Sequence, residues 1–386
     1  MMLKSTTARF CPSIHDRFTA LARSRLDACQ TVRHALLVGV VLALTGCSNA
    51  PVDDTSNQSS ASAPAAHAAA AASATPTEMR AVLHIISSIE PAAIRPLLQD
   101  FAKQHEVDIR VVTTTPRQLV ATLSGQPADI VLSSDTDILQ QAAEGALLQP
   151  FNAEQAADAV PDAYLDPDGN WLPLSYHART AVYDGRWLKS ADIGSFASLA
   201  APKWAQKLCL TSAQDPANQA LVAQLIHDMG ETKTRSVLQG WLANLARPPF
   251  ADDDALLAGI ARGECQVGLV DSQHFAQFAE QNPNTPLALT WINASSGGVP
   301  KRLTAIAMAR ASQQPELALQ LIEWLAKPDQ QSLFASLTDT YPIHPQAEPS
   351  VRLKAWGDGV YSALTPEQSH AGLANAKMLM DDVGYR

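Results

Sequence analysis

The sequence has no surplus of basic residues. Its 386 residues include 28 lysines and arginines against 38 aspartates and glutamates, a formal net charge of −10. Six of the basic and two of the acidic residues lie in the first 46, so the remaining chain has 22 basic and 36 acidic residues and a net charge of −14. Because nucleic-acid phosphates are bound by basic surfaces, this acidic body argues against a nucleic-acid partner.

The familiar signatures of catalytic sites are also missing. The chain has no GxSxG, HExxH or CxxC motif and no glycine-rich phosphate-binding loop, and its ten histidines are scattered. We therefore expect a binding protein rather than an enzyme.

The apolar run near the N-terminus is too short to cross a bilayer. Ala35–Leu44 has ten residues, the length of a signal-peptide core. It ends in LTGC, Leu44–Cys47, which resembles a bacterial lipobox. We expect residues 1–46 to be a signal peptide and Cys47 to be acylated and anchored to the membrane on the periplasmic side. Ser48 favours the outer membrane; an ordinary signal peptide with a chance cysteine is the alternative.

The chain has only five cysteines. Cys11 and Cys29 fall in the expected signal peptide, and Cys47 is the expected lipid site. This leaves Cys209 and Cys265, an even pair in an oxidising compartment, each in an apolar run that is typical of a strand. We predict a disulfide between them; two buried free thiols are the alternative.

The length suits about two domains. Residues 47–78 are rich in Ala, Ser and Pro and are expected to be a disordered tether. Beyond them, strand patterns alternate with helix patterns, which predicts an α/β fold. The expected parts are a first lobe from 79–177 and 305–386 that includes the C-terminal helices, a second lobe from 178–304, and crossing segments near 176–183 and 300–309.

From Leu83 onward, the chain resembles bacterial periplasmic ferric-iron-binding proteins, the solute-binding subunits of ABC importers. The resemblance lies in segments such as PADIVLSSDTDILQQAAEGALLQPF, and in WLANLARPP followed by GEC. It implies a type II periplasmic-binding-protein-like fold with two mostly parallel sheets joined by a hinge. Solute would bind between the lobes, at strand ends and helix N-termini. It also implies an ABC permease as partner and a monomeric protein.

The iron site of that family is not retained. The family has two adjacent tyrosines after the strand that follows GEC, but GECQVGLVDSQHF has Gln273 and His274 there, and Asp271 where Asn is common. Glutamine is a poor ligand for ferric iron, and histidine prefers softer divalent ions. The cargo is therefore expected to differ from ordinary ferric iron.

The remaining cleft positions follow from the same resemblance. Glu90 stands where the family has histidine, and Thr211 and Ser212 precede a helix that could receive an anion. The implied cleft is lined by Glu90, Ser134, Asp135, Tyr176, Arg179, Thr211, Ser212, Asp271, Gln273 and His274. A weaker metal site for Fe³⁺ or a divalent ion, built from Glu90, Tyr176 and His274, stays open.

Several of these residues have a structural alternative. Glu90 could simply stabilise a helix start. Either Tyr176 or its neighbour His177 should face the cleft because strand side chains alternate, and we expect Tyr176 to do so. Arg179 could bind an anion or pair with Asp135 or Asp271. His274 could hydrogen-bond a neighbour, contact solute or ligate metal.

The sequence thus predicts a lipid-anchored solute-binding protein of an ABC importer with an altered cargo. That cargo could be a chelated metal, a divalent ion, or a small anion such as a phosphonate-like or carboxylate compound. No resident cofactor is expected. The alternative is a non-transporting envelope lipoprotein that uses the same fold to bind a partner.

Overall fold

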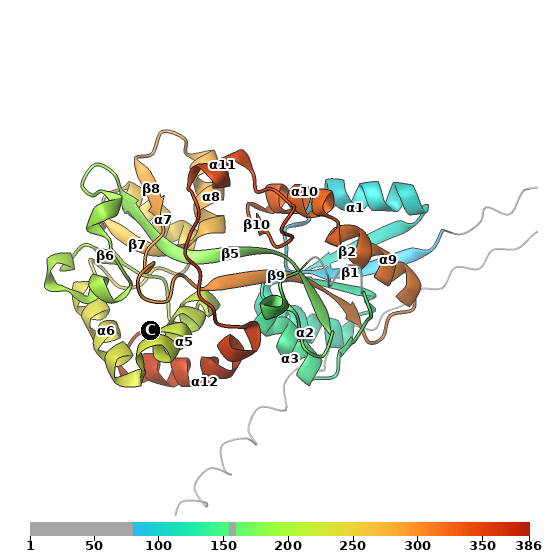
Figure 1. The fold of residues 1–386 in the computed structure, drawn as a ribbon, viewed down its shortest axis with the longest axis horizontal. Coiled ribbons are helices and arrows are strands. Elements are labelled where there is room, and N and C mark those ends of the chain that lie inside the picture. Colours follow the sequence, from blue (N-terminus) through green and yellow to red (C-terminus); the bar gives the residue numbers. More distant parts are fainter. Residues whose placement is uncertain (1–79, 154–159) are drawn as a thin grey trace, which may run out of the picture. The chain divides into compact units, whose positions relative to one another are not determined.

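The computed structural model describes residues 80–153 and 160–386. The expected signal peptide, Cys47 and the tether through residue 78 lie outside the described residues. The described part contains two lobes connected by two long strands (Figure 1). None of its helices has both the length and the apolar character needed to span a membrane.

The first lobe is built on three parallel strands, with β1 between β2 and β3. Its helices cover this sheet because they bury one apolar face; Ile94, Leu97, Leu98 and Phe101 of α1 are all buried, as the helical pattern predicts. The elements are β1 (Val82–Ser87), α1 (Pro91–His105), β2 (Asp108–Thr113), α2 (Pro116–Gly125), β3 (Ile130–Ser133), α3 (Thr136–Glu144), β4 (Leu148–Gln149) and the short helix η1 (Asp162–Tyr164).

The second lobe has a parallel pair, β6 and β7, surrounded by helices. Its elements are the short helices η2 (Ser190–Asp192), η3 (Ala197–Ala200) and η4 (Pro202–Trp204), then β6 (Leu208–Cys209), α5 (Pro216–Met229), α6 (Glu231–Asn244), α7 (Asp253–Ala261), β7 (Val267–Asp271), α8 (Ser272–Gln281) and β8 (Leu287–Thr290).

The crossing strands are β5 (Trp171–Asp184) and β9 (Lys301–Ala309). They pair antiparallel over the first half of β5, and the second half of β5 pairs antiparallel with β7 and β8. β9 also pairs with β3, so the sheet runs continuously through both lobes in the order β2-β1-β3-β9-β5-β7-β6. The carboxyl ends of β3 and β7 consequently lie beside the crossing strands.

The C-terminal region divides between the lobes. It comprises α9 (Pro315–Ala326), α10 (Pro328–Thr338), β10 (Tyr341–Pro342), α11 (Val351–Ala355) and α12 (Pro366–Asp382). α9 and α10 pack on the first lobe, whereas α12 lies beside α5 (Figure 1). Ala376, Leu379 and Met380 of α12 are buried in the core of the second lobe, so 305–386 is not one unit.

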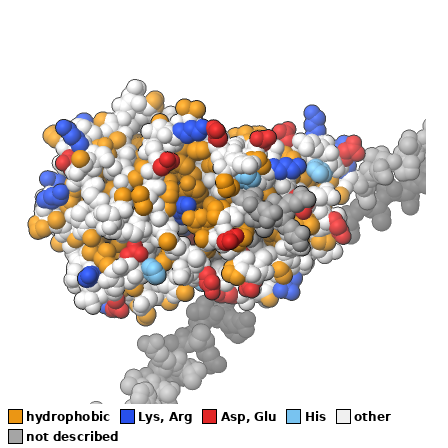
Figure 2. Space-filling model, in the orientation of Figure 1, with side chains coloured by type: hydrophobic (Ala, Val, Ile, Leu, Met, Phe, Trp, Pro, Cys, Tyr) orange, Lys and Arg blue, Asp and Glu red, His pale blue; other side chains and the backbone are white. Residues whose placement is uncertain are grey.

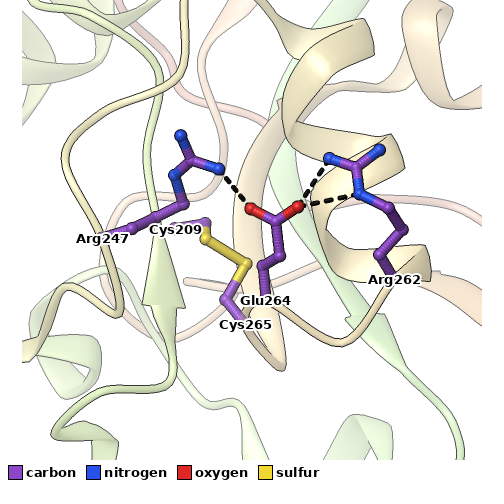
Figure 3. Close-up of a disulfide and its surroundings, with 5 residues drawn as sticks. All are labelled: Cys209, Arg247, Arg262, Glu264 and Cys265. Atoms are coloured by element: carbon purple, nitrogen blue, oxygen red, sulfur yellow. Dashed lines mark hydrogen bonds and ion pairs between the residues drawn. A yellow bond between two sulfur atoms is a disulfide. The ribbon is translucent and has the colours of Figure 1, made fainter.

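In the structure Cys209 and Cys265 form a disulfide, with Cα atoms 6.0 Å apart. It joins the end of β6 to the residues just before β7, beside the parallel pairing of those strands (Figure 3). Next to it, the Glu264 carboxylate accepts hydrogen bonds from both Arg247 and Arg262. The two sulfur atoms are buried, while this ion cluster is at the surface.

Candidate functional site

Polar side chains gather on one face of the crossing strands. His177 of β5 and Arg302 of β9 are register partners and therefore lie on the same face, as does Arg179 two residues further along β5. The opposite face holds Tyr176, Leu303 and Lys301. Since the Nε2 atom of His177 lies 3.4 Å from the Ser134 carbonyl, His177 rather than Tyr176 faces the predicted cleft residues. Tyr176 points to the other side of β5, and its assignment to the cleft stays a prediction.

Two ion pairs connect this face to the strand ends. Arg302 lies 2.6 Å from Asp135, the residue that caps α3 by accepting a hydrogen bond from the Asp137 amide. His177 Nδ1 lies 3.5 Å from Asp271 Oδ1. Burial alone would raise the pKa of Asp271, but His177, followed by Arg302 and Arg179, outweighs it and lowers that pKa strongly. Asp271 is therefore an anion at neutral pH.

Arg179 is in the protein interior and not on an accessible cleft wall. Its side chain is fully buried and bonds Asp253 at 3.2 Å, the Thr211 hydroxyl at 2.8 Å and the Leu269 carbonyl at 3.0 Å. The sequence indicated Asp135 or Asp271 as its partner; the observed partner comes from α7. Asp253 is the first residue of α7, and α7 packs against β5, a contact that local sequence does not reveal.

Thr211 is likewise committed to internal contacts. Its hydroxyl accepts from Arg179 and Asn218 and donates to Asp215, the N-cap of α5. The Ser212 hydroxyl accepts from the Gln214 amide. The N-terminus of α5 is therefore partly satisfied by its own side chains, which leaves the Thr211 hydroxyl without a free position for an anion.

The two residues at the family's tyrosine positions occupy the first turn of α8. Gln273 donates a 2.7 Å hydrogen bond from Nε2 to the carbonyl of Thr338, at the end of α10 in the first lobe. His274 Nδ1 lies 3.3 Å from Asp253. Burial would lower the pKa of His274, but Asp253 outweighs it and raises this pKa to about 9. His274 is thus a cation at neutral pH.

The structure gives no support for the possible metal site. Glu90 is exposed at the start of α1 and its side chain makes no capping hydrogen bond. Burial, followed by the neighbouring Tyr361, raises the pKa of Tyr176 well above its usual value, which opposes formation of a phenolate. Within residues 80–153 and 160–386, no group of three or more His, Cys, Asp or Glu side chains is arranged to hold a metal ion.

Ser134 and Asp135 line the side of the site that belongs to the first lobe. The Ser134 amide donates to the Ser88 hydroxyl at 3.0 Å, and the two hydroxyls are 3.3 Å apart. The buried Nε atom of Arg302 has no hydrogen-bond partner in the described part of the chain, while His177 Nδ1 and Asp271 Oδ1 have only their mutual contact at 3.5 Å. Since buried polar atoms are almost always hydrogen-bonded, the Arg302 Nε atom indicates a place for water or a polar solute.

A cavity of about 900 Å³ lies between the lobes next to this face. Asp135 and residues of α2 and α3 form one wall, the start of α5 forms another, and α12 forms a third. At its rim, Arg117 of α2 donates a hydrogen bond to the Gln214 carbonyl of the second lobe. The α12 wall was missed by the sequence reasoning, because its apolar residues do not indicate which lobe they cover.

The family model for bacterial extracellular solute-binding proteins matches residues 97–358. The chain belongs to this family. It is a solute-binding protein of the group that includes the ferric-iron-binding proteins.

Curated relatives of this solute-binding protein differ in the cargo that their names state. It is 23% identical to iron uptake protein A1 of Synechocystis over 81% of this chain and 89% of the relative. Identity to the major ferric iron-binding protein of Neisseria meningitidis is 25%, over 64% and 76%. Identity to a putative 2-aminoethylphosphonate-binding periplasmic protein of Salmonella typhi is 27%, over 72% and 77%.

Solved structures give the fold class. A Trichodesmium protein in complex with iron and citrate superposes with a TM-score of 0.74 at 23% identity, over 79% of this chain and all of that one. The apo ferric ion-binding protein A of Pasteurella haemolytica gives 0.72 at 24% identity, over 79% and 98%. The solute-binding protein therefore has the α/β fold of type II periplasmic binding proteins.

Proposed function

We propose that this chain is the lipid-anchored solute-binding subunit of an ABC importer, with a small anion or an anion-chelated metal as its cargo in place of bare ferric iron. The observation that carries the proposal is the engagement of Gln273 and His274. The Gln273 amide is hydrogen-bonded to a main-chain carbonyl, and the His274 imidazole is paired with Asp253. Neither side chain has an anionic oxygen to offer. Ferric iron favours such oxygens.

The charges around the cleft support an anionic cargo. Two buried carboxylates there already lie next to a guanidinium, Asp135 next to Arg302 and Asp253 next to Arg179, and Asp271 lies next to the His177 imidazole. A trivalent cation would have to displace these partners. An anion in the cavity would instead meet Arg117, Lys377 and Arg386, which line it together with three aspartates. The cavity is large enough for a small organic anion.

The cargoes named for the relatives also include a metal and an organic anion. Iron and an aminophosphonate are both named among proteins 23–27% identical to this chain. A phosphonate is an anion, and iron can travel as a chelate. Under the proposal, the cargo is a phosphonate-like anion or chelated iron, and no tyrosine phenolate of this chain holds ferric iron.

Ligand-dependent stabilisation tests the cargo. Wild-type protein would be heated with phosphate, 2-aminoethylphosphonate, citrate, ferric citrate, or ferric chloride under non-chelating conditions, and complexes would be checked by native mass spectrometry. A ligand at 100 times its Kd stabilises the folded state by about 2.7 kcal/mol, so binding is readily seen. Stabilisation by an anion or by ferric citrate supports the proposal, whereas tight binding of unchelated iron contradicts it.

A charge reversal locates the binding. Arg117→Glu places a negative charge at the rim of the interlobe cavity, and Arg110→Glu makes the same change at an exposed position on β2. We expect only the first variant to weaken anion binding. Equal effects of the two variants would count against the interlobe cavity as the site.

The lipid anchor has a separate test. Cys47→Ser should move the protein from the membrane fraction to the soluble periplasmic fraction and abolish labelling with radioactive palmitate. Cys11→Ser, within the expected signal peptide, serves as the control and should change neither result. A membrane-bound Cys47→Ser protein would refute the anchor but would leave the cargo proposal intact.

The alternative, a partner-binding envelope lipoprotein, gains support from one observation. Arg117 and Gln273 each bond a carbonyl of the opposite lobe, contacts that hold the lobes together through the chain's own groups. If no member of the ligand panel stabilises the wild type or the Arg117→Ala variant, in which one of these contacts is removed, the alternative is favoured.

A further inference from the structure

Lys301 lies among three tyrosine rings at the start of β9. Its Nζ atom is 4.4 Å from the ring centroid of Tyr176, 4.5 Å from that of Tyr164 and 4.6 Å from that of Tyr361. It also donates a 2.8 Å hydrogen bond to the Tyr164 hydroxyl. All three distances fall within the range of about 6 Å over which a cation is attracted to an aromatic face.

The rings around Lys301 form a continuous aromatic surface. Tyr176 stacks on Tyr341 with centroids 5.3 Å apart, and Tyr361 meets Tyr176 edge-on at 5.3 Å. Trp291 contacts both Tyr341 and Tyr361, at 6.1 and 5.8 Å. We call these five rings, Tyr164, Tyr176, Trp291, Tyr341 and Tyr361, together with Lys301, the aromatic site.

This surface is open to solvent in part. Tyr164, Tyr176, Trp291, Tyr361 and Lys301 are each partly exposed. The crossing of β5 and β9 lies near the centre of the view in Figure 1, and in the same orientation Figure 2 shows a hollow in which hydrophobic side chains surround a basic one. A contiguous apolar hollow on the surface of a soluble protein commonly marks a binding site.

The residues of the aromatic site do not line the 900 Å³ cavity between α3, α5 and α12. Tyr176 and Lys301 lie on the face of the crossing strands opposite His177 and Arg302, because adjacent residues of a strand point to opposite sides. A cavity of about 30 Å³ at the edge of β9 is lined by Lys301 and Tyr164 as well as by Arg302 and Asp135, but it has room for about one water molecule only. A solute in the 900 Å³ cavity therefore does not fill the aromatic site.

Lys301 has no ion-pair partner within residues 80–153 and 160–386, unlike the neighbouring Arg302, which pairs with Asp135. The negative charge of Asp358 contributes to the raised pKa of Tyr176, Tyr341 and Tyr361. Asp358 nevertheless forms no ion pair with Lys301. An ammonium group among aromatic faces with an open side is complementary to an anion. Because the rings already hold one cation, a second cation would be repelled.

We propose that the aromatic site is a second binding site, for a small aromatic carboxylate. The carboxylate pairs with the Lys301 ammonium, and the ring packs against the exposed faces of Trp291 and the tyrosines. Stacking supplies affinity for a planar ring, and the ammonium selects the acid over a neutral or basic analogue. This inference is independent of the cargo bound between the lobes.

Benzoate is a suitable probe, with benzyl alcohol, benzylammonium and cyclohexanecarboxylate as analogues that lack the charge, reverse it or lack the aromatic ring. Calorimetry and tryptophan fluorescence, which reports through Trp291, would measure binding to the full chain. We expect benzoate to bind more tightly than all three analogues. The absence of benzoate binding, or a preference for benzylammonium, would overturn the proposal.

Lysine variants identify the charged group. Lys301→Met removes the charge but keeps a side chain of similar length. It should weaken benzoate binding roughly tenfold or more, the loss expected for one charge-assisted hydrogen bond. Lys301→Arg should largely preserve binding. Lys203→Met is the matched control, since Lys203 lies 5.0 Å from the single ring of Trp204 at another surface. Melting curves establish that each variant is folded.

A competition experiment separates the two sites. Benzoate binding should be unchanged by Arg117→Glu at the interlobe cavity and by saturating amounts of any ligand found for the cleft. If such a ligand displaces benzoate, or if Lys301→Met leaves the benzoate affinity unaltered, benzoate does not bind at the aromatic site and the proposal fails.

Discussion

The side-chain amide of Gln273, in the second lobe, donates a 2.7 Å hydrogen bond to the main-chain carbonyl of Thr338 in the first. From there, hydrogen-bonded hydroxyls continue through Thr338 and Thr340 to Ser175 of β5. Gln273, which the family resemblance places at a tyrosine position, is therefore a structural link between the lobes.

Restoring the tyrosine pair should restore affinity for ferric iron. Gln273→Tyr combined with His274→Tyr adds two phenol oxygens, and we expect the affinity for Fe³⁺ to rise by at least about tenfold. The measurement is an iron titration that follows the visible tyrosinate-to-iron absorption band. Replacing both residues with phenylalanine is the control, because it supplies the rings without oxygen. A wild-type protein that already shows this band would contradict our interpretation of the pair.

Asp253→Asn should be severely destabilising. It leaves the fully buried guanidinium of Arg179 without its main counter-charge, a change that costs about 3–5 kcal/mol in other buried pairs. Urea denaturation measures the loss in free energy of unfolding. Glu231→Gln, which breaks an exposed pair with Arg235, should change this free energy little. Similar effects of the two substitutions would show that the buried cluster is not a major determinant of stability.

His274 should make the stability of the protein depend on pH between about 6.5 and 9. Asp253 raises the pKa of this imidazole to about 9 in the folded state, above its ordinary value of 6.5. The folded state therefore binds the proton more tightly, and this contribution is complete below pH 6.5 and disappears as the pH rises through 9. Its size is limited because 42% of the side chain is exposed.

Two measurements isolate that histidine. The NMR titration of the His274 ring should give a midpoint near 9 in the wild type. The free energy of unfolding of the wild type should decline between pH 6.5 and 9 in part because His274 loses its proton. This part of the decline should be absent in His274→Gln. A ring that titrates near 6.5 would refute the pairing with Asp253.

Removal of the disulfide should lower stability substantially. The bond between Cys209 and Cys265 spans 56 positions, for which chain entropy predicts about 4 kcal/mol. Replacing both cysteines with alanine, and comparing denaturant midpoints with the wild type, tests this value. In addition, Cys209 and Cys265 of the unfolded wild type should react with a thiol reagent only after reduction. Immediate reaction at both positions without a reductant would show that the bond does not form.

Much of the fold could be anticipated because local patterns determine it. The apolar spacing of Ile94, Leu97, Leu98 and Phe101 is sufficient to define the buried face of α1. β8 escaped prediction because three of its four residues are only partly buried and it pairs with the distant end of β5.

The candidate site was less predictable because its contacts join residues far apart in the sequence. Arg179 was expected to have an acidic partner, but Asp253 is 74 positions away and only the packing of α7 selects it. Likewise, strand alternation requires Tyr176 and His177 to face opposite sides of the sheet, but it does not determine which of them shares a side with Arg302. The register with Arg302 determines that.

The position of β9 between β3 and β5 also constrains how the protein acquires its structure. Residues 301–309 complete the sheet of the first lobe, although most of the second lobe precedes them in the chain. Until they dock, β3, whose four residues are all buried in the final structure, presents an apolar edge without a neighbour. Such edges promote aggregation, and contacts of long sequence separation form slowly. The chain should therefore refold slowly and depend on holding factors that protect β3 until β9 arrives.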